Sequence, residues 1–210
     1  MSGSTKREDG SQETKSKIFE AAAKVFALKG YQGGSMREIA RAADVNLALI
    51  NYHFKDKKQL FISVFDHGLG VWAELLESKR GAELSELLAF LMKETTDIDG
   101  AAYYMNIFMR LFLGRDVEVP QLERIFTEGP PSIDVLQEAV AKRMKRDSII
   151  DPDVILVTNY LMNYLVLSSR YSFGMTKEIS DKSYIRPFLE GEDLYTSAII
   201  DLADRLCRCI

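Results

Sequence analysis

The sequence has few of the residues that build disulfide frameworks, metal centres or catalytic triads. Its 210 residues include two cysteines, Cys207 and Cys209, and two histidines, His53 and His67. A Cys-x-Cys pair at the chain end cannot form a disulfide that links distant segments of a fold. We therefore expect the protein in a reducing compartment, the cytoplasm. Neither histidine lies in a nucleophile–base–acid arrangement, and no Gly-rich phosphate loop occurs. We therefore expect no enzyme, no cofactor and no metal. A metal or redox site formed by His67 with the two cysteines is the weak alternative.

Long apolar runs and alternating patterns are also missing. The longest uncharged run, residues 154–169, contains Thr158, Asn159 and Asn163 and is shorter than the ~20 apolar residues that span a bilayer. No apolar segment near the N-terminus resembles a signal peptide. No stretch alternates polar and apolar residues with a period of two, so no sheet is expected. With 47% hydrophobic residues the chain can bury a core. We expect an all-α cytoplasmic protein without a membrane partner.

The charge is unevenly distributed along the chain. The net charge of −4 at first argues against a nucleic-acid partner. Residues 14–60, however, hold nine Lys or Arg and four acids, a balance of +5, so the remainder carries −9. A basic module attached to an acidic body is typical of a DNA-binding domain joined to a regulatory domain.

Residues 35–61 have the pattern of a helix-turn-helix with its supporting helix. Ser35 followed by Glu38 forms a capping box, which predicts the start of a short helix. Asp44 tolerates the left-handed conformation that ends a helix sharply, and Asn46 is the next N-cap. The second helix is expected over 47–54, which leaves the three- to four-residue turn that the motif requires. The apolar positions of the first helix repeat at helical spacing: Met36, Ile39, Ala40 and Ala43.

The second helix carries the signal for DNA recognition. Leu47 and Ala48 would be exposed apolar residues, and contact with a thymine methyl group in the major groove would account for their exposure. Asn51 can form hydrogen bonds with adenine. The adjacent polar and basic residues suit phosphates, although Tyr52 and His53 could instead pack and Arg37 could be a solvated charge. Backbone N–H groups of Ser35 and Met36 also suit a phosphate. The predicted DNA-binding residues are Ser35, Met36, Arg37, Asn46, Leu47, Ala48, Asn51, Tyr52, His53 and Lys57.

This stretch resembles the DNA-binding domain of the TetR family of transcriptional regulators. The resemblance covers residues 14–65, and Asp44 stands where the family usually has Gly. A polar residue often stands where this chain has Leu47 and Ala48. The matching segments are Gly30-Tyr31, Ser35-Met36-Arg37-Glu38-Ile39-Ala40, Ala43-Asp44-Val45, Tyr52-His53-Phe54-Lys55-Asp56-Lys57 and Leu60-Phe61.

The expected organisation is a disordered arm (1–12), a helix-turn-helix domain (13–65) and a helical regulatory, ligand-binding and dimerisation domain (66–210). Gly30 should stop the first helix, which starts near Glu13. One short helix reads few base pairs, so a homodimer on a palindromic operator is expected. Apolar stripes on 132–146 and 192–209 are candidates for the dimer surface, or for ordinary core. Further helices are expected at 57–79, 83–95, 100–113, 120–127 and 153–173.

Helices 100–113 and 153–173 are apolar on nearly every side yet contain polar residues. Buried polar groups need partners, and a buried arginine needs an anion. One interpretation is a cavity for a small effector, with Arg110 or Arg170 on a carboxylate; the other is internal pairing or an interface. The candidate ligand-binding residues are Tyr103, Asn106, Met109, Arg110, Asn159, Tyr160, Asn163, Tyr164 and Arg170.

These observations, with the resemblance, favour a DNA-binding transcriptional regulator, and specifically a repressor released by a small apolar or amphipathic effector. Two alternatives stay open at this point. One is a DNA-binding protein of the same fold without a small-molecule effector, acting structurally or through a protein partner. The other is an enzyme using the helical body, which would turn over its substrate unaffected by changes at Asn51 and Tyr52.

Overall fold

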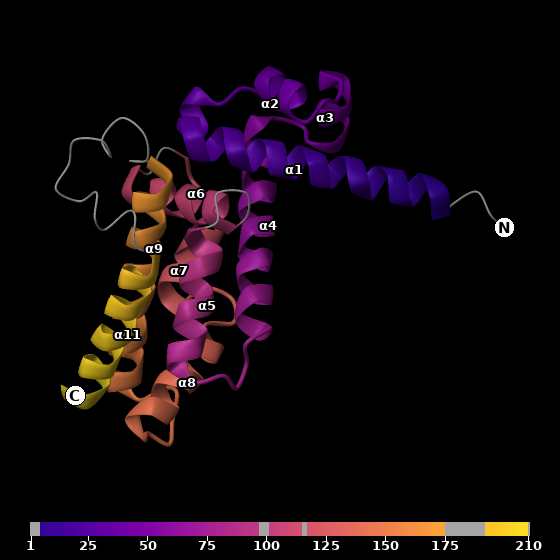
Figure 1. Cartoon of the computed structure of the whole chain (residues 1–210). Coiled ribbons are helices and arrows are strands. Elements are labelled where there is room, and N and C mark those ends of the chain that lie inside the picture. The colour runs from indigo at the N-terminus through magenta and orange to yellow at the C-terminus, as the bar shows by residue number, and fades with distance from the viewer. Residues whose placement is uncertain (1–4, 97–100, 115–116, 175–191, 210) are drawn as a thin grey trace, which may run out of the picture. The chain divides into compact units, whose positions relative to one another are not determined.

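The protein is all-helical, as the sequence predicts. The computed structural model describes residues 5–96, 101–114, 117–174 and 192–209, which form ten α-helices and no strand (Figure 1). Predicted and observed helix ends agree within two residues, apart from those of the first helix. The helices are α1 (Thr5–Gly33), α2 (Met36–Ala42), α3 (Leu47–His53), α4 (Lys57–Glu77), α5 (Leu84–Thr96), α6 (Ala101–Gly114), α7 (Gln121–Glu128), α8 (Ile133–Met144), α9 (Pro152–Gly174) and α11 (Glu192–Cys209).

Helix α1 begins earlier than expected. It starts at Thr5, whereas the sequence suggests a disordered arm over residues 1–12 and a helix from Glu13. Once a helix is nucleated, each added residue costs little, so the charged residues before Glu13 extend it. The expected stop at Gly30 is confirmed, because Gly30 has φ 72° and ψ 175° and interrupts the helical backbone.

The chain divides into two compact units, one comprising Met1–Gly68 and Ile107–Pro120, the other Leu69–Asn106 and Gln121–Ile210. The division within α4 follows Gly68, and a functional domain boundary near residue 65 stays a prediction. The inclusion of Ile107–Pro120 in the first unit is unexpected, since the sequence pattern places that segment in the body. Helices α4 and α6 therefore each begin in one unit and end in the other.

The first unit has a core built from α1, α2, α3 and the start of α4. Its fully buried members include Ile18 and Phe26 of α1, as the helical stripe predicts, with Ile39 and Ile50 from the motif. The rings of Phe26 and Phe61 meet edge to face with centroids 4.9 Å apart. Burial of each large apolar side chain of this core stabilises the folded state by about 1.5–3 kcal/mol, because the side chain is removed from water. This core holds α2 and α3 against α1 (Figure 1).

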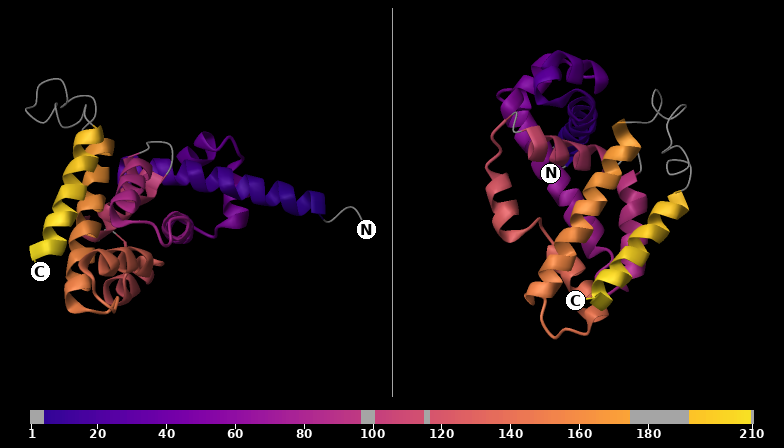
Figure 2. Two further views of the ribbon diagram at one scale, coloured as in Figure 1. Left: turned by 60° about the horizontal axis from the view of Figure 1, so that its bottom comes forward. Right: turned by 90° about the vertical axis from the view of Figure 1, so that its left-hand side faces the viewer.

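The second unit is a bundle in which α5, α8, α9 and α11 pack against one another, with α9 and α11 running side by side (Figure 2). Leu136 and Val140 of α8 and Ile199 and Ala203 of α11 are buried within the chain. The α8 stripe is therefore core, whereas the α11 stripe is only partly buried, since Leu202 is 38% exposed. No helix among the described residues has an apolar stretch long enough to cross a membrane.

Candidate DNA-binding surface

The predicted caps of the helix-turn-helix are present. The Glu38 N–H donates to Ser35 Oγ at 3.2 Å, and the Ala48 N–H donates to Asn46 Oδ1 at 2.8 Å. Asp44 takes the left-handed conformation expected of it, with φ 53°. The Glu38 carboxylate, expected to complete a capping box, forms an ion pair with Lys29 of α1. Local sequence thus starts and stops both helices, and the ion pair adds a link from α2 to α1.

The inner sides of α2 and α3 are fixed by burial. Ile39 and Ile50 are fully buried, and the small residues Ala40 and Ala43 are also buried where the helices cross. An alanine leaves room for a close approach of two helix backbones, which longer side chains would prevent. Because one side of α3 is buried against α2 and the core, the side chains on its opposite side face outward.

The outer side of α3 is exposed at the positions where the sequence pattern predicts reading residues. Tyr52 is 82% exposed, and Ala48 and Asn51 are exposed beside it. The His53 ring is half-buried and lies edge to face with Tyr52 at a centroid distance of 5.2 Å. Of the ten predicted residues, Ser35, Arg37, Asn46, Ala48, Asn51 and Tyr52 are exposed, and Met36, Leu47, His53 and Lys57 are half-buried.

Lys57 has protein partners in the structure. Its Nζ donates to the Gln32 carbonyl at 3.3 Å and lies 4.6 Å from the centre of the Tyr31 ring. Partial burial lowers the pKa of this ammonium group. These two contacts provide a local explanation for a cation in the first turn of α4, where the helix dipole disfavours it. A phosphate contact by Lys57 stays a prediction.

Arg110 lies in the first unit. Its Nε donates to the Ala27 carbonyl at 3.0 Å and its Nη2 to the Leu28 carbonyl at 3.4 Å. The sequence pattern leaves two roles open for Arg110, on the carboxylate of an effector or in an internal pair. Two carbonyl groups near the end of α1 take part of its hydrogen-bonding capacity.

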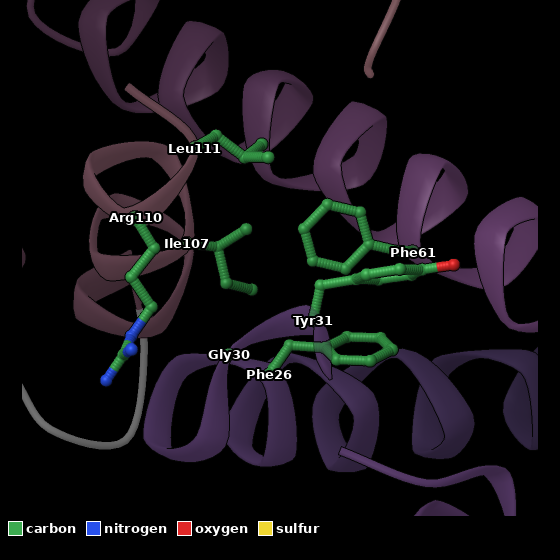
Figure 3. Close-up of a pocket in the computed structure, with 7 residues that line it drawn as sticks. All are labelled: Phe26, Gly30, Tyr31, Phe61, Ile107, Arg110 and Leu111. Carbon is green, nitrogen blue, oxygen red and sulfur yellow. The ribbon is translucent and has the colours of Figure 1, made fainter. Parts of the chain in front are cut away.

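A small pocket lies next to Arg110, lined by side chains of α1, α4 and α6 (Figure 3). Its volume, ≈ 10 Å³, is enough for about one water molecule and too small for an effector. The lining residues are Phe26, Gly30, Tyr31, Phe61, Ile107, Arg110 and Leu111.

The other candidate ligand residues are not gathered on one buried surface. Tyr103 and Asn106 of α6 are buried, whereas Asn159, Tyr160 and Asn163 are exposed along α9. Tyr164 is half-buried, and the side chains of Met109 and Arg170 lie outside the described residues. The ligand-binding role of this set stays a prediction. In the part of the chain that the structure describes, no cluster of three or more His, Cys, Asp or Glu could hold a metal ion.

A capped helix-turn-helix with an exposed second helix defines a DNA-binding regulator. The pattern of bacterial regulatory proteins of the tetR family matches residues 18–64. The chain is 29% identical to the HTH-type transcriptional regulator AcrR of Shigella flexneri over 204 residues, 90% of this chain and 93% of AcrR. It is 28% identical to the fatty acid metabolism regulator protein of Bacillus subtilis over 161 residues, 70% and 82% of the two chains.

Solved structures show the same architecture. A candidate fatty acid metabolism regulator of Clostridium perfringens superposes with a TM-score of 0.62 at 26% identity, covering 88% of this chain and 97% of the other. The chain therefore belongs to the TetR family of transcriptional regulators, and it is a regulator rather than an enzyme.

Proposed function

We propose that the protein is a transcriptional repressor that reads a palindromic operator with α3 of two protomers. The exposed outer side of α3, with Tyr52 82% exposed above a buried inner side, is the observation that supports this most directly. In this proposal Asn51 and Ala48 contact base edges in the major groove, and Ser35, Arg37, Tyr52 and His53 contact the sugar–phosphate backbone. The remaining predicted residues, Met36, Asn46, Leu47 and Lys57, complete the surface.

Selection of bound duplexes from random DNA tests the DNA-reading proposal. We expect wild-type protein to recover a palindrome and Asn51→Ala to recover a motif relaxed at one position in each half-site, since a bidentate contact discriminates by about 1–3 kcal/mol. Tyr52→Ala should weaken binding evenly across sequences. An unaltered motif and affinity with both variants would show that α3 is not the reading element.

The dimer surface we propose is the outer face of α9 together with α11. Leu156 and Tyr160 of α9 are 46% and 55% exposed, and Leu202 of α11 is 38% exposed. The exposed positions of α9 fall at 152, 155, 156, 159, 160 and 163, the spacing of one helical face. Apolar residues gathered on one face of two adjacent helices are typical of a partner-binding surface. A second copy of the chain is the partner that a palindromic operator requires.

The oligomeric state of a Leu156→Arg variant tests this surface. An arginine in the centre of an apolar interface leaves a charge without a partner, so the variant should elute as a monomer in light-scattering chromatography. It should also lose high-affinity operator binding. Ile150→Arg is the matched control, because Ile150 is 76% exposed outside this face and should leave the dimer intact. A dimeric Leu156→Arg protein would place the interface elsewhere.

The effector we propose is an acyl thioester of coenzyme A. Two relatives above 25% identity, from B. subtilis and C. perfringens, carry names that refer to fatty acid metabolism. The solved structure of FadR from B. subtilis, with the same fold, contains stearoyl-CoA, and that of AibR contains isovaleryl coenzyme A and operator DNA. An effector releases DNA only through different affinities for the two states of the protein. A cytoplasmic location, where such thioesters occur, stays a prediction.

Release of the selected operator by stearoyl-CoA, isovaleryl-CoA, coenzyme A and stearate tests the effector. We expect one thioester to shift the operator Kd by roughly 5- to 150-fold and free coenzyme A to have no effect. Release by none of the four compounds would overturn the thioester proposal and favour a regulator that responds to a protein partner or to nothing.

A further inference from the structure

The C-terminal end of the regular part of α1 is held by a side chain from α6. A helix end leaves carbonyl groups without helical partners, and cations are favoured there by the helix dipole. Arg110 provides the cation, with Nε 3.0 Å from the Ala27 carbonyl oxygen and Nη2 3.4 Å from that of Leu28. Hydrogen bonds that involve a charged donor are stronger than neutral ones. One guanidinium thus links α6 to two successive residues of α1.

Apolar contacts place Arg110 for this role. Ile107 and Leu111, one turn apart on the same helix, are buried and point toward the aromatic rings of α1 and α4 (Figure 3). Gly30 lies beside the guanidinium, since a Cβ atom there would be in ordinary contact with Nη1 of Arg110, at 3.5 Å. The buried neighbours on α6 therefore set the direction of the Arg110 side chain, and its two hydrogen bonds hold the guanidinium at the end of α1.

The end of α1 also determines where α2 begins. The Gly34 N–H donates to the Gly30 carbonyl at 3.2 Å, which closes the turn directly before the cap residue Ser35. A Cβ on Gly34 would lie 3.0 Å from Val25 and 3.1 Å from Phe26, so α2 starts in close contact with α1. The Lys29–Glu38 ion pair joins the same two helices. A movement of residues 27–30 is thus carried into α2 and, through the buried crossing, into α3.

We propose that Arg110 is a positioning residue for operator binding, which holds the end of α1 so that α2 and α3 keep the orientation that fits DNA. Arg110 does this without touching DNA or an effector. Arg110 and residues 27–30 lie in the same compact unit, so the contact belongs to the unit that contains α2 and α3. The proposal rests on DNA binding by the family and is independent of the proposed effector.

Operator affinity of Arg110→Gln, measured by fluorescence anisotropy on the selected duplex, tests the proposal. We expect roughly tenfold weaker binding, since Arg110→Gln removes the charged donor of two hydrogen bonds, one part-buried and one exposed. Arg110→Lys keeps the charge and one donor and should recover part of the affinity, about threefold below wild type. Arg124→Gln is the matched control, because Arg124 is an exposed arginine that pairs across one helical turn with Glu128, and it should bind as wild type does.

Two further readouts separate positioning from other roles. If Arg110 contacted a phosphate, its replacement would make the slope of log affinity against log salt shallower by about 0.9, whereas we expect Arg110→Gln to leave that slope unchanged. Amide hydrogen exchange should increase at residues 30–38 in both Arg110 variants and stay unchanged elsewhere at a temperature where the variants are folded.

Each outcome bears on the proposal. Wild-type affinity and wild-type exchange in Arg110→Gln would overturn it, and so would a reduced salt slope, which would make Arg110 a phosphate ligand. Faster exchange with unchanged affinity would also overturn it, because Arg110 would then have a purely structural role. If Arg110→Gln does not fold, Arg110→Lys carries the same comparison.

Discussion

Replacing Gly30 by alanine should destabilise the DNA-binding unit through its backbone. Gly30 has φ 72° and ψ 175°, a combination that residues with a Cβ adopt at a cost of about 1–3 kcal/mol. Crowding adds little, because the new Cβ would lie 3.5 Å from Arg110 Nη1, an ordinary contact distance. Relief of glycine entropy in the unfolded chain returns about 0.4–1 kcal/mol. We expect a net loss of roughly 1–2 kcal/mol in the free energy of unfolding.

Gly70→Ala is the matched control for this substitution. Gly70 lies exposed within α4, and a Cβ added there would meet no heavy atom within 4 Å, so alanine should raise stability by roughly 0.5–1 kcal/mol. The two variants make the same chemical change and should move the urea midpoint, followed by circular dichroism, in opposite directions. Equal midpoints for the two variants would refute the assignment of Gly30 as a conformationally required glycine. Gly30→Ala should also weaken operator binding, since it disturbs the end of α1 that Arg110 holds.

Three further predictions concern single side chains. Asn46→Ala removes the cap of α3 and should cost about 1 kcal/mol in urea unfolding, whereas Asn46→Asp, which keeps the accepting oxygen, should cost little. Lys145→Gly should stabilise the second unit by about 1 kcal/mol in thermal unfolding, because Lys145 ends α8 with φ 58°; a lower Tm would contradict the strain argument. Hydrogen bonds from Arg80 and then Ser132 lower the pKa of Glu77 from 4.5 to about 2. The ionised Glu77 carboxylate therefore stabilises the fold fully above pH 4.5, and this stabilisation is lost as the pH falls toward 2. The stabilities of wild type and Glu77→Gln should converge across that range, and a difference that stays constant with pH would refute this.

The helix-turn-helix was predictable because its signals are local. Ser35, Asp44 and Asn46 each act on a backbone group within three residues, so sequence spacing alone determines their roles. The helices of the body were predictable for a related reason, because helical periodicity and turn residues mark their ends.

Contacts between distant segments were not predictable. An arginine in an apolar helix needs a partner, and for Arg110 the sequence leaves open an effector anion or an internal group. It does not show that the partner is the end of α1, 82 and 83 positions earlier. Helices α8, α9 and α11 all carry apolar stripes, and only packing decides which stripe is covered. The α8 stripe is core, whereas Leu156 and Tyr160 of α9 remain exposed.

The proposed reading of DNA by two α3 helices is tested most directly by varying the spacing between the two halves of the selected operator. Half-sites one turn apart, about 10–10.5 base pairs, face the same side of the duplex. We predict two protomers per duplex, tight binding at the selected spacing, and loss of most sequence-specific affinity when about five base pairs, half a turn, are inserted. Binding that is indifferent to the insertion, with one protomer per duplex, would contradict a dimeric regulator that reads DNA through α3.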